Sequence, residues 1–141
     1  MVNLLWESYV TGSEARPPTA LMNESGVLET RMKGHHGAPD QALLDEVVHR
    51  IVEVAHPQKV ILFGSAARGE MGPDSDLDFL VIVKGPVHQF HLEQEIYTRL
   101  PYVGVAVDAI VVTEEAVRRY GNVVGTIIRP ALREGRVVYA A

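Results

Sequence analysis

Apolar residues recur at helical spacing from about position 40 onward. Those at 43, 44, 47, 48, 51, 54 and 55 fall on one helical face, and Pro57 ends the run. Asp40 follows Pro39 and is a suitable N-cap, because its carboxylate can accept a hydrogen bond from a free N–H group of the first turn. The pattern therefore predicts an amphipathic helix between Asp40 and Pro57.

Short β-branched runs and further helical segments alternate after Pro57. We expect strands at 59–63, 77–83, 103–112 and 136–139. A helical turn at 66–68 and helices at 87–100, 114–120 and 126–133 separate them, with Thr113 as an N-cap and Gly135 as a C-terminal stop. In the helix expected at 87–100, the side chains that point inward should be Phe90, Ile96, Tyr97 and Leu100. This order predicts an α/β (α+β) domain, a mixed sheet of about four strands flanked by helices.

The first 38 residues follow a different pattern. Loop signals lie at 16–19 and 33–39, and periodicity between them is weak, with at most a short helix around 20–32. We interpret residues 1–38 as an arm or extension and 39–141 as the folded domain. A chain of 141 residues fits one such domain.

Composition excludes several classes of function. The chain has no cysteine, so it has neither disulfides nor thiolate chemistry. No signal peptide or membrane-spanning run is evident, so we expect a cytoplasmic protein without membrane contact. A net charge of −5 without a Lys/Arg run speaks against direct nucleic-acid binding. It is compatible with nucleotide chemistry, because a divalent cation screens the phosphates.

Gly64-Ser65 directly follows a predicted buried strand. Backbone N–H groups at such a turn can face a phosphate, and glycine permits close approach. Arg68 lies on the same turn and is placed to reach triphosphate oxygens as a bidentate donor. Together these residues predict a nucleotide-binding turn.

Two carboxylates open the next predicted strand. Alternation puts Asp76 and Asp78 on one face, about 6–7 Å apart, with Leu77 on the other. Carboxylate oxygens are suitable ligands for Mg²⁺, which is commonly held by one or two carboxylates and by substrate phosphates. This pair therefore predicts a magnesium site.

Asp108 interrupts an otherwise apolar predicted strand. A buried carboxylate costs several kcal/mol unless it is paired or bound to a metal. A cation shared with Asp76 and Asp78 would satisfy it, and a third carboxylate is what a two-metal site requires. Taken singly, each feature has an ordinary interpretation: a plain turn, a solvated strand end, a hydrogen-bonded or interface carboxylate, a surface arginine. Their order and placement together favour a shared site.

The combined motif resembles a known family. Gly64-Ser65, ten residues and then Asp76-Leu77-Asp78 is similar to the signature of the DNA polymerase β-like nucleotidyltransferase superfamily. The longer stretches 63–69, 75–81, 107–110 and 127–139 resemble its minimal nucleotidyltransferase (MNT) subfamily. The resemblance covers roughly residues 40–141 and leaves the first 38 residues without a counterpart.

The resemblance implies a function. Gly64 and Ser65 would bind the triphosphate of ATP, Asp76 and Asp78 would hold one or two Mg²⁺ ions, and Asp108 would complete the site and help activate the acceptor. We also assign Ser75, within the motif, to nucleotide binding. Members are often antitoxins encoded beside a HEPN-domain RNase toxin, and they resemble enzymes that attach AMP to that partner, often on a tyrosine. A HEPN protein is therefore the expected partner, and an oligomer is compatible with the sequence.

Two other functions remain open at this point. The chain can act as an antitoxin mainly by binding its toxin, or it can modify a small molecule such as an aminoglycoside, although such enzymes usually carry an extra helical domain. His88 and His91 lie three residues apart on a predicted helix, but no third ligand lies nearby and zinc is not favoured. For Arg129 and Arg133 a solvated helix face is favoured over partner binding.

Overall fold

The computed structural model describes residues 37–100 and 104–141. The helix expected around 20–32 and the first residue of the strand expected at 103–112 lie outside this part of the chain. Gly37 and Met71 form an antiparallel bridge, in which each backbone N–H donates to the other's carbonyl at 2.9–3.0 Å. The segment before the first described helix is thereby joined to the loop that precedes the strand Leu77–Val83.

The first described helix, α3, spans Gln41–Ala55. The Asp40 side chain accepts a hydrogen bond from the Ala42 N–H at 3.2 Å, which confirms the predicted N-cap. His56 ends the helix in the left-handed conformation, and Pro57 follows. The helix buries six of its apolar residues: Leu43, Leu44, Val47, Val48, Ile51 and Val52.

A four-stranded mixed sheet forms the centre of the fold. The strands are β1 (Lys59–Phe63), β2 (Leu77–Val83), β3 (Val107–Thr113) and β4 (Arg136–Ala140), in the order β3-β2-β1-β4. β1 pairs antiparallel with both β2 and β4, whereas β2 and β3 are parallel. The predicted mixed sheet is confirmed, with β3 beginning at Val107 and forming one edge.

The remaining helices are α4 (Gly64–Ala67), α5 (Gln89–Arg99), α6 (Glu114–Tyr120) and α7 (Ile128–Glu134). Thr113 caps α6 as predicted, by accepting a hydrogen bond from the Ala116 N–H at 3.1 Å. The helix expected at 87–100 begins only at Gln89, because His88 Nδ1 caps it by accepting from the His91 N–H. The expectation that Phe90 points inward was wrong, since the residue is 62% exposed in the first turn of a helix that buries only Ile96.

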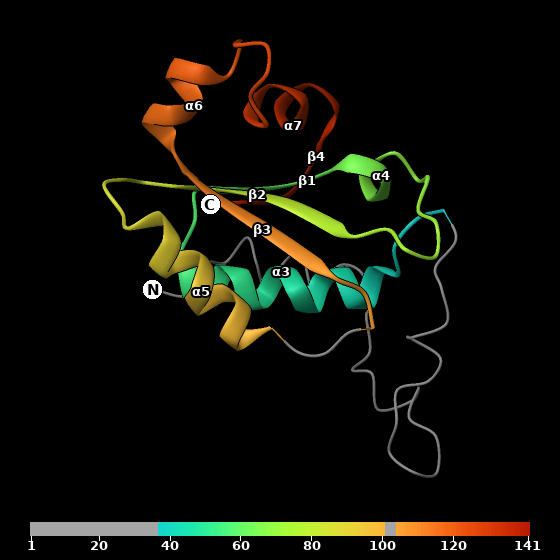
Figure 1. Ribbon diagram of the computed structural model, residues 1–141. Helices are drawn as coiled ribbons and strands as arrows, with labels where there is room; N and C mark the ends of the chain where they lie inside the picture. The colour runs from blue at the N-terminus through green and yellow to red at the C-terminus, as the bar shows by residue number, and fades with distance from the viewer. Residues whose placement is uncertain (1–36, 101–103) are drawn as a thin grey trace.

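Helices cover both faces of the sheet (Figure 1). Side chains of β1, β2 and β3 alternate between the faces, as strand geometry requires. One face packs against α3 and α5 and contains most of the core, including Leu77, Phe79 and Val81. The other face is smaller and packs against α6 and α7, with Leu80 and Ile82 among its buried residues.

In the described part of the chain, no helix has the length and apolar character needed to cross a membrane.

Candidate functional site

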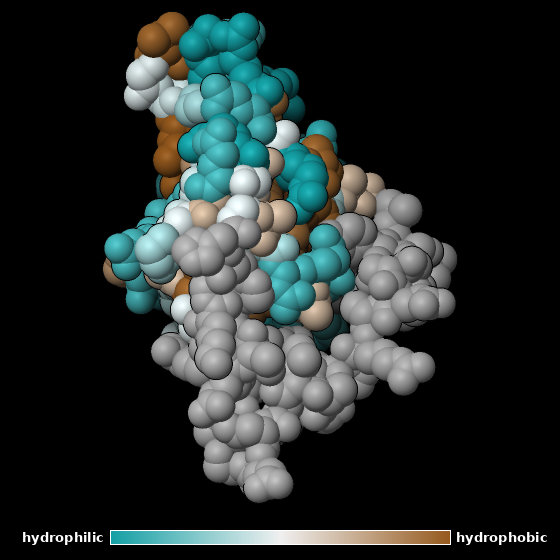
Figure 2. Space-filling model, turned by 90° about the vertical axis from the view of Figure 1, so that its right-hand side faces the viewer, coloured by the Kyte–Doolittle hydropathy of each residue, from teal (hydrophilic) through white to brown (hydrophobic). Residues whose placement is uncertain are grey.

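Three chain segments that carry the predicted site residues meet at one end of the sheet. β1 and β2 are antiparallel and β2 and β3 are parallel, so the end of β1 lies beside the beginnings of β2 and β3. α4 follows β1 directly at this end of the sheet (Figure 1). Figure 2 views the molecule from that side. Residues that are far apart in sequence therefore come together here.

Asp78 and Asp108 are direct neighbours across two strands. They are register partners in the parallel pair β2–β3. Because register partners in a sheet share a face, both side chains lie on the face that Leu80 and Ile82 line against α6 and α7. Asp76 immediately precedes β2 and is exposed. The sheet register thus brings the second and third predicted carboxylates side by side.

Gly64 lies against the Asp78 carboxylate. Phe63, the last residue of β1, pairs with Asp78, and the chain then turns into α4 with Gly64 at φ +72°. A Cβ atom at Gly64 would stand 2.6 Å from Asp78 Oδ2, closer than any real contact. Glycine therefore suits this position for its left-handed conformation, and a larger residue would have to displace the Asp78 carboxylate.

The Asp78 carboxylate is destabilised in its charged form. Burial raises its pKa above the ordinary value of 3.8, and the nearby carboxylates of Asp108 and Asp76 raise that pKa further. Carboxylates whose charges repel one another in this way favour binding of a cation. The charges at this end of the sheet therefore favour a bound cation.

Asp108 is exposed and not buried within its strand, so the expectation of a buried charge was wrong. The reason is that β3 is an edge strand, with no neighbouring strand on one side. Its carboxylate Oδ1 accepts a hydrogen bond from the Tyr97 hydroxyl at 2.9 Å. Asp108 is thus hydrogen-bonded to a phenol and otherwise exposed.

A known protein family matches most of this chain. The family model described as "Nucleotidyltransferase domain" matches residues 43–136. The chain belongs to the nucleotidyltransferase domain family. The predicted polymerase β-like fold and the MNT-like character are thereby confirmed, and the protein is a nucleotidyltransferase.

Individual proteins are also similar to this chain. A Methanocaldococcus jannaschii protein named "Putative protein adenylyltransferase" is 40% identical over 83 residues, which cover 58% of this chain and 78% of that protein. A crystal structure of a "putative nucleotidyltransferase" from Sulfolobus solfataricus aligns with a TM-score of 0.46 and 24% identity, over 67% of this chain and 75% of that one. A toxin–antitoxin crystal structure with AMP-PNP aligns with a TM-score of 0.45 and 17% identity, over 67% and 72% of the two chains. The family assignment depends on the family model and on the M. jannaschii relative.

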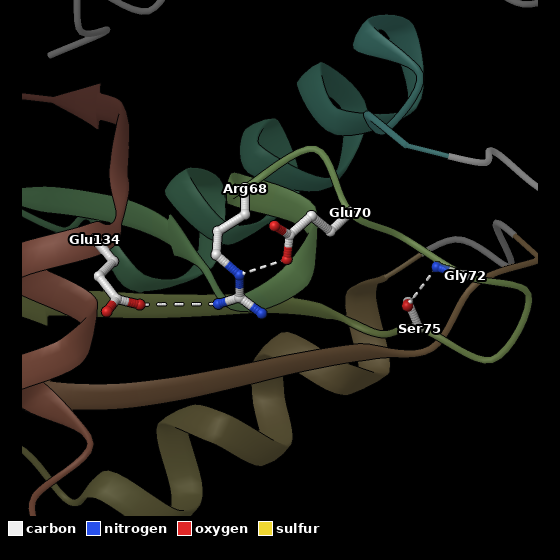
Figure 3. Close-up of polar contacts among 5 residues, drawn as sticks. All are labelled: Arg68, Glu70, Gly72, Ser75 and Glu134. Atoms are coloured by element: carbon white, nitrogen blue, oxygen red, sulfur yellow. Dashed lines mark hydrogen bonds and ion pairs between the residues drawn. The ribbon is translucent and has the colours of Figure 1, made fainter.

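In this nucleotidyltransferase Arg68 and Ser75 make contacts of their own (Figure 3). Arg68 Nε lies 2.9 Å from the Glu70 carboxylate, and one terminal nitrogen lies 3.8 Å from that of Glu134 on α7. Ser75 Oγ accepts a hydrogen bond from the Gly72 N–H at 2.8 Å and so closes the loop before β2. Both residues lie in the predicted motif, and their roles in nucleotide binding stay predictions.

The carboxylates suit magnesium by their chemistry, since hard oxygen ligands are what this ion prefers. Over residues 37–100 and 104–141, no three acidic or histidine side chains stand close enough together to hold a metal ion by themselves. His88 and His91 stack on one another, with ring centroids 3.9 Å apart. A metal at Asp78 and Asp108 would therefore need ligands from the nucleotide.

The sequence interpretation missed Tyr97 and Glu93 as polar residues of this region. Tyr97 was expected to point inward, yet the residue is 38% exposed and its hydroxyl lies at the edge of β3. Burial raises the pKa of the Tyr97 phenol above its ordinary value of 10.0, and the neighbouring Asp108 carboxylate raises it further, although the hydrogen bond from the Ala109 N–H lowers it. The spacing of four residues between Glu93 and Tyr97, which puts both on one side of a helix, was the available signal.

Proposed function

We propose that this nucleotidyltransferase transfers AMP from ATP to a hydroxyl group of a partner protein, with Mg²⁺ as the metal. The observation that carries the proposal is the pairing of Asp78 with Asp108 beside Gly64. It is supported by the M. jannaschii relative, whose name describes it as a protein adenylyltransferase. The proposed partner, from the resemblance to the MNT subfamily, is a HEPN-domain toxin, for which the chain would be the antitoxin.

Each site residue has a part in this proposal. The turn at Gly64 and Ser65 would hold the triphosphate, and Arg68 and Ser75 would contribute further contacts to the nucleotide. Asp76 and Asp78 would hold Mg²⁺ together with phosphate oxygens, and Asp108 would complete that site. When bound, the metal would neutralise the charge that develops on the phosphates.

The transfer step forms one bond and breaks another. The acceptor oxygen attacks the α-phosphorus, the bond from that phosphorus to the β-phosphate bridging oxygen breaks, and pyrophosphate leaves. Asp108 would accept the proton of the acceptor hydroxyl through its carboxylate. In-line positioning of the two oxygens and electrostatic stabilisation of the phosphates together supply most of the rate enhancement in such reactions.

The experiment combines the full chain, ATP, Mg²⁺ and the protein encoded by the neighbouring gene. Mass spectrometry of that protein should show an added AMP, and Asp76→Ala with Asp78→Ala should abolish the adduct. Asp74→Ala, which removes an exposed carboxylate from the same loop, is the matched control and should leave transfer unchanged. No adduct with the wild-type chain would contradict the proposal.

A purely binding antitoxin predicts a different outcome. The double variant at Asp76 and Asp78 would then still neutralise the toxin and bind it with unchanged affinity. A measurement of toxin activity alongside complex affinity separates the two functions.

A further inference from the structure

Helix α5 lies along the open edge of β3 and supplies it with hydrogen-bond partners. Glu93 Oε1 accepts from the Val111 N–H at 3.0 Å, and the Tyr97 hydroxyl oxygen accepts from the Ala109 N–H at 3.1 Å. Residues four apart on a helix and two apart on a strand have similar separations, about 6 Å. Two successive turns of α5 therefore satisfy two successive N–H groups that an edge strand would otherwise leave open.

Tyr97 makes one further contact that Glu93 does not. Its O–H donates to Asp108 Oδ1 at 2.9 Å while its oxygen accepts from the Ala109 N–H. The phenol is thus held by the backbone next to the carboxylate that it binds. Among the described residues, Tyr97 is the only hydrogen-bond donor to that carboxylate, so Oδ2 stays open for a ligand.

We propose that Tyr97 is a positioning residue that fixes the Asp108 carboxylate in the orientation that metal binding and proton acceptance require. The inference rests on the proposed function, because it gives Asp108 those two tasks. The reason is entropic and geometric. Asp108 is exposed on an edge strand, where nothing else in the described structure restrains its side chain, and a carboxylate that is already oriented loses less freedom when a ligand binds.

Hydrogen-bond partners of metal-ligating groups typically change metal affinity or activity about 10–100-fold when they are removed. Tyr97→Phe keeps the ring but removes both hydrogen bonds of the hydroxyl. Glu93→Ala is the matched control, because it also removes an edge partner of β3 but leaves Asp108 untouched. We expect both variants to lower stability to a similar small extent, and only Tyr97→Phe to affect the metal site.

The test uses the full chain, Mn²⁺ as the probe and an ATP analogue with a non-cleavable α–β bridge. Free Mn²⁺ is measured by electron paramagnetic resonance during titration. Tyr97→Phe should weaken Mn²⁺ binding about 10–100-fold, whereas Glu93→Ala should bind it as the wild type does. In the adenylylation reaction, Tyr97→Phe should lower kcat, with the KM for the acceptor protein unchanged.

Two results would overturn the inference: wild-type Mn²⁺ affinity and kcat in Tyr97→Phe, or an equal loss in Glu93→Ala. A nucleotide adduct on Tyr97 itself would do so as well, because the hydroxyl would then be an acceptor. If instead the wild-type chain modifies no protein but the Mn²⁺ affinities differ as expected, the proposed function fails while the positioning role of Tyr97 stands.

Discussion

Gly64 and Gly69 have nearly the same backbone conformation, with φ angles of +72° and +70°, but different surroundings. A Cβ at Gly64 would meet Asp78 Oδ2 at 2.6 Å, whereas a Cβ at Gly69 would have no neighbour within 4 Å. Alanine at either position would therefore lose stability because of the left-handed backbone, but only alanine at Gly64 would also press against the Asp78 carboxylate. Comparing the two variants separates the effect of glycine on backbone conformation from its effect on the position of Asp78.

We expect Gly64→Ala and Gly69→Ala each to lose about 1–2 kcal/mol of stability for the left-handed conformation. Gly64→Ala should also displace Asp78, and a shift of about 1 Å at a reacting centre can lower the rate about 100-fold. Urea denaturation and the rate of adenylylation are the measurements. Comparable activity of the two variants would mean that Gly64 does not set the position of Asp78.

At the scale of elements, α4 and α7 face each other across Arg68. The guanidinium lies between Glu70 in the loop and Glu134 at the end of α7, with both carboxylates exposed (Figure 3). Exposed ion pairs contribute little to stability, about 0–1 kcal/mol. Triphosphate oxygens can thus displace the two carboxylates from Arg68 at small cost.

We expect Arg68→Ala to raise the KM for ATP about tenfold or more, since a hydrogen bond to a charged group contributes roughly 1.5–3 kcal/mol. Glu134→Gln should leave the KM unchanged or lower it, because it frees the same arginine. Stability should change little in either variant. An unchanged KM in Arg68→Ala would remove this residue from the nucleotide site.

The elements themselves followed from local pattern. The Asp40 and Thr113 caps and the ends of β1 and β2 are set by short-range chemistry, so the sequence predicts them correctly. The exposure of Asp108 depends on strand order, which places β3 at an edge, and an apolar run alone cannot distinguish an edge strand from a central one. The interaction of Tyr97 with Asp108 likewise depends on how α5 lies against that edge, a long-range feature.

At the scale of the whole molecule, the protein carries a net charge of −5 and gathers carboxylates at one end of its sheet. The raised pKa of Asp78 means that the folded state holds this proton more tightly than the unfolded chain does. The contribution of Asp78 to stability therefore falls as the pH rises above 3.8 and levels off above the folded-state pKa. A cation that binds only the folded state opposes this loss.

Asp78→Asn removes both a metal ligand and the repulsion between Asp78 and the neighbouring carboxylates. The substitution should therefore stabilise the protein without the cation and make it less stable than the wild type when the cation is bound. Without metal, the variant should gain stability relative to the wild type as the pH rises above 3.8, by less than about 1 kcal/mol because the group is partly exposed.

With Mg²⁺ and ATP at neutral pH, the wild type should gain thermal stability by mass action and the variant should not. Asp74→Asn, in the exposed loop before β2, removes the same unit of charge outside the strands and should gain thermal stability as the wild type does. Thermal melts across the pH range, with and without Mg²⁺ and ATP, compare the three chains. If Mg²⁺ and ATP stabilise Asp78→Asn as much as the wild type, the cation binds elsewhere and Asp78 is not its ligand.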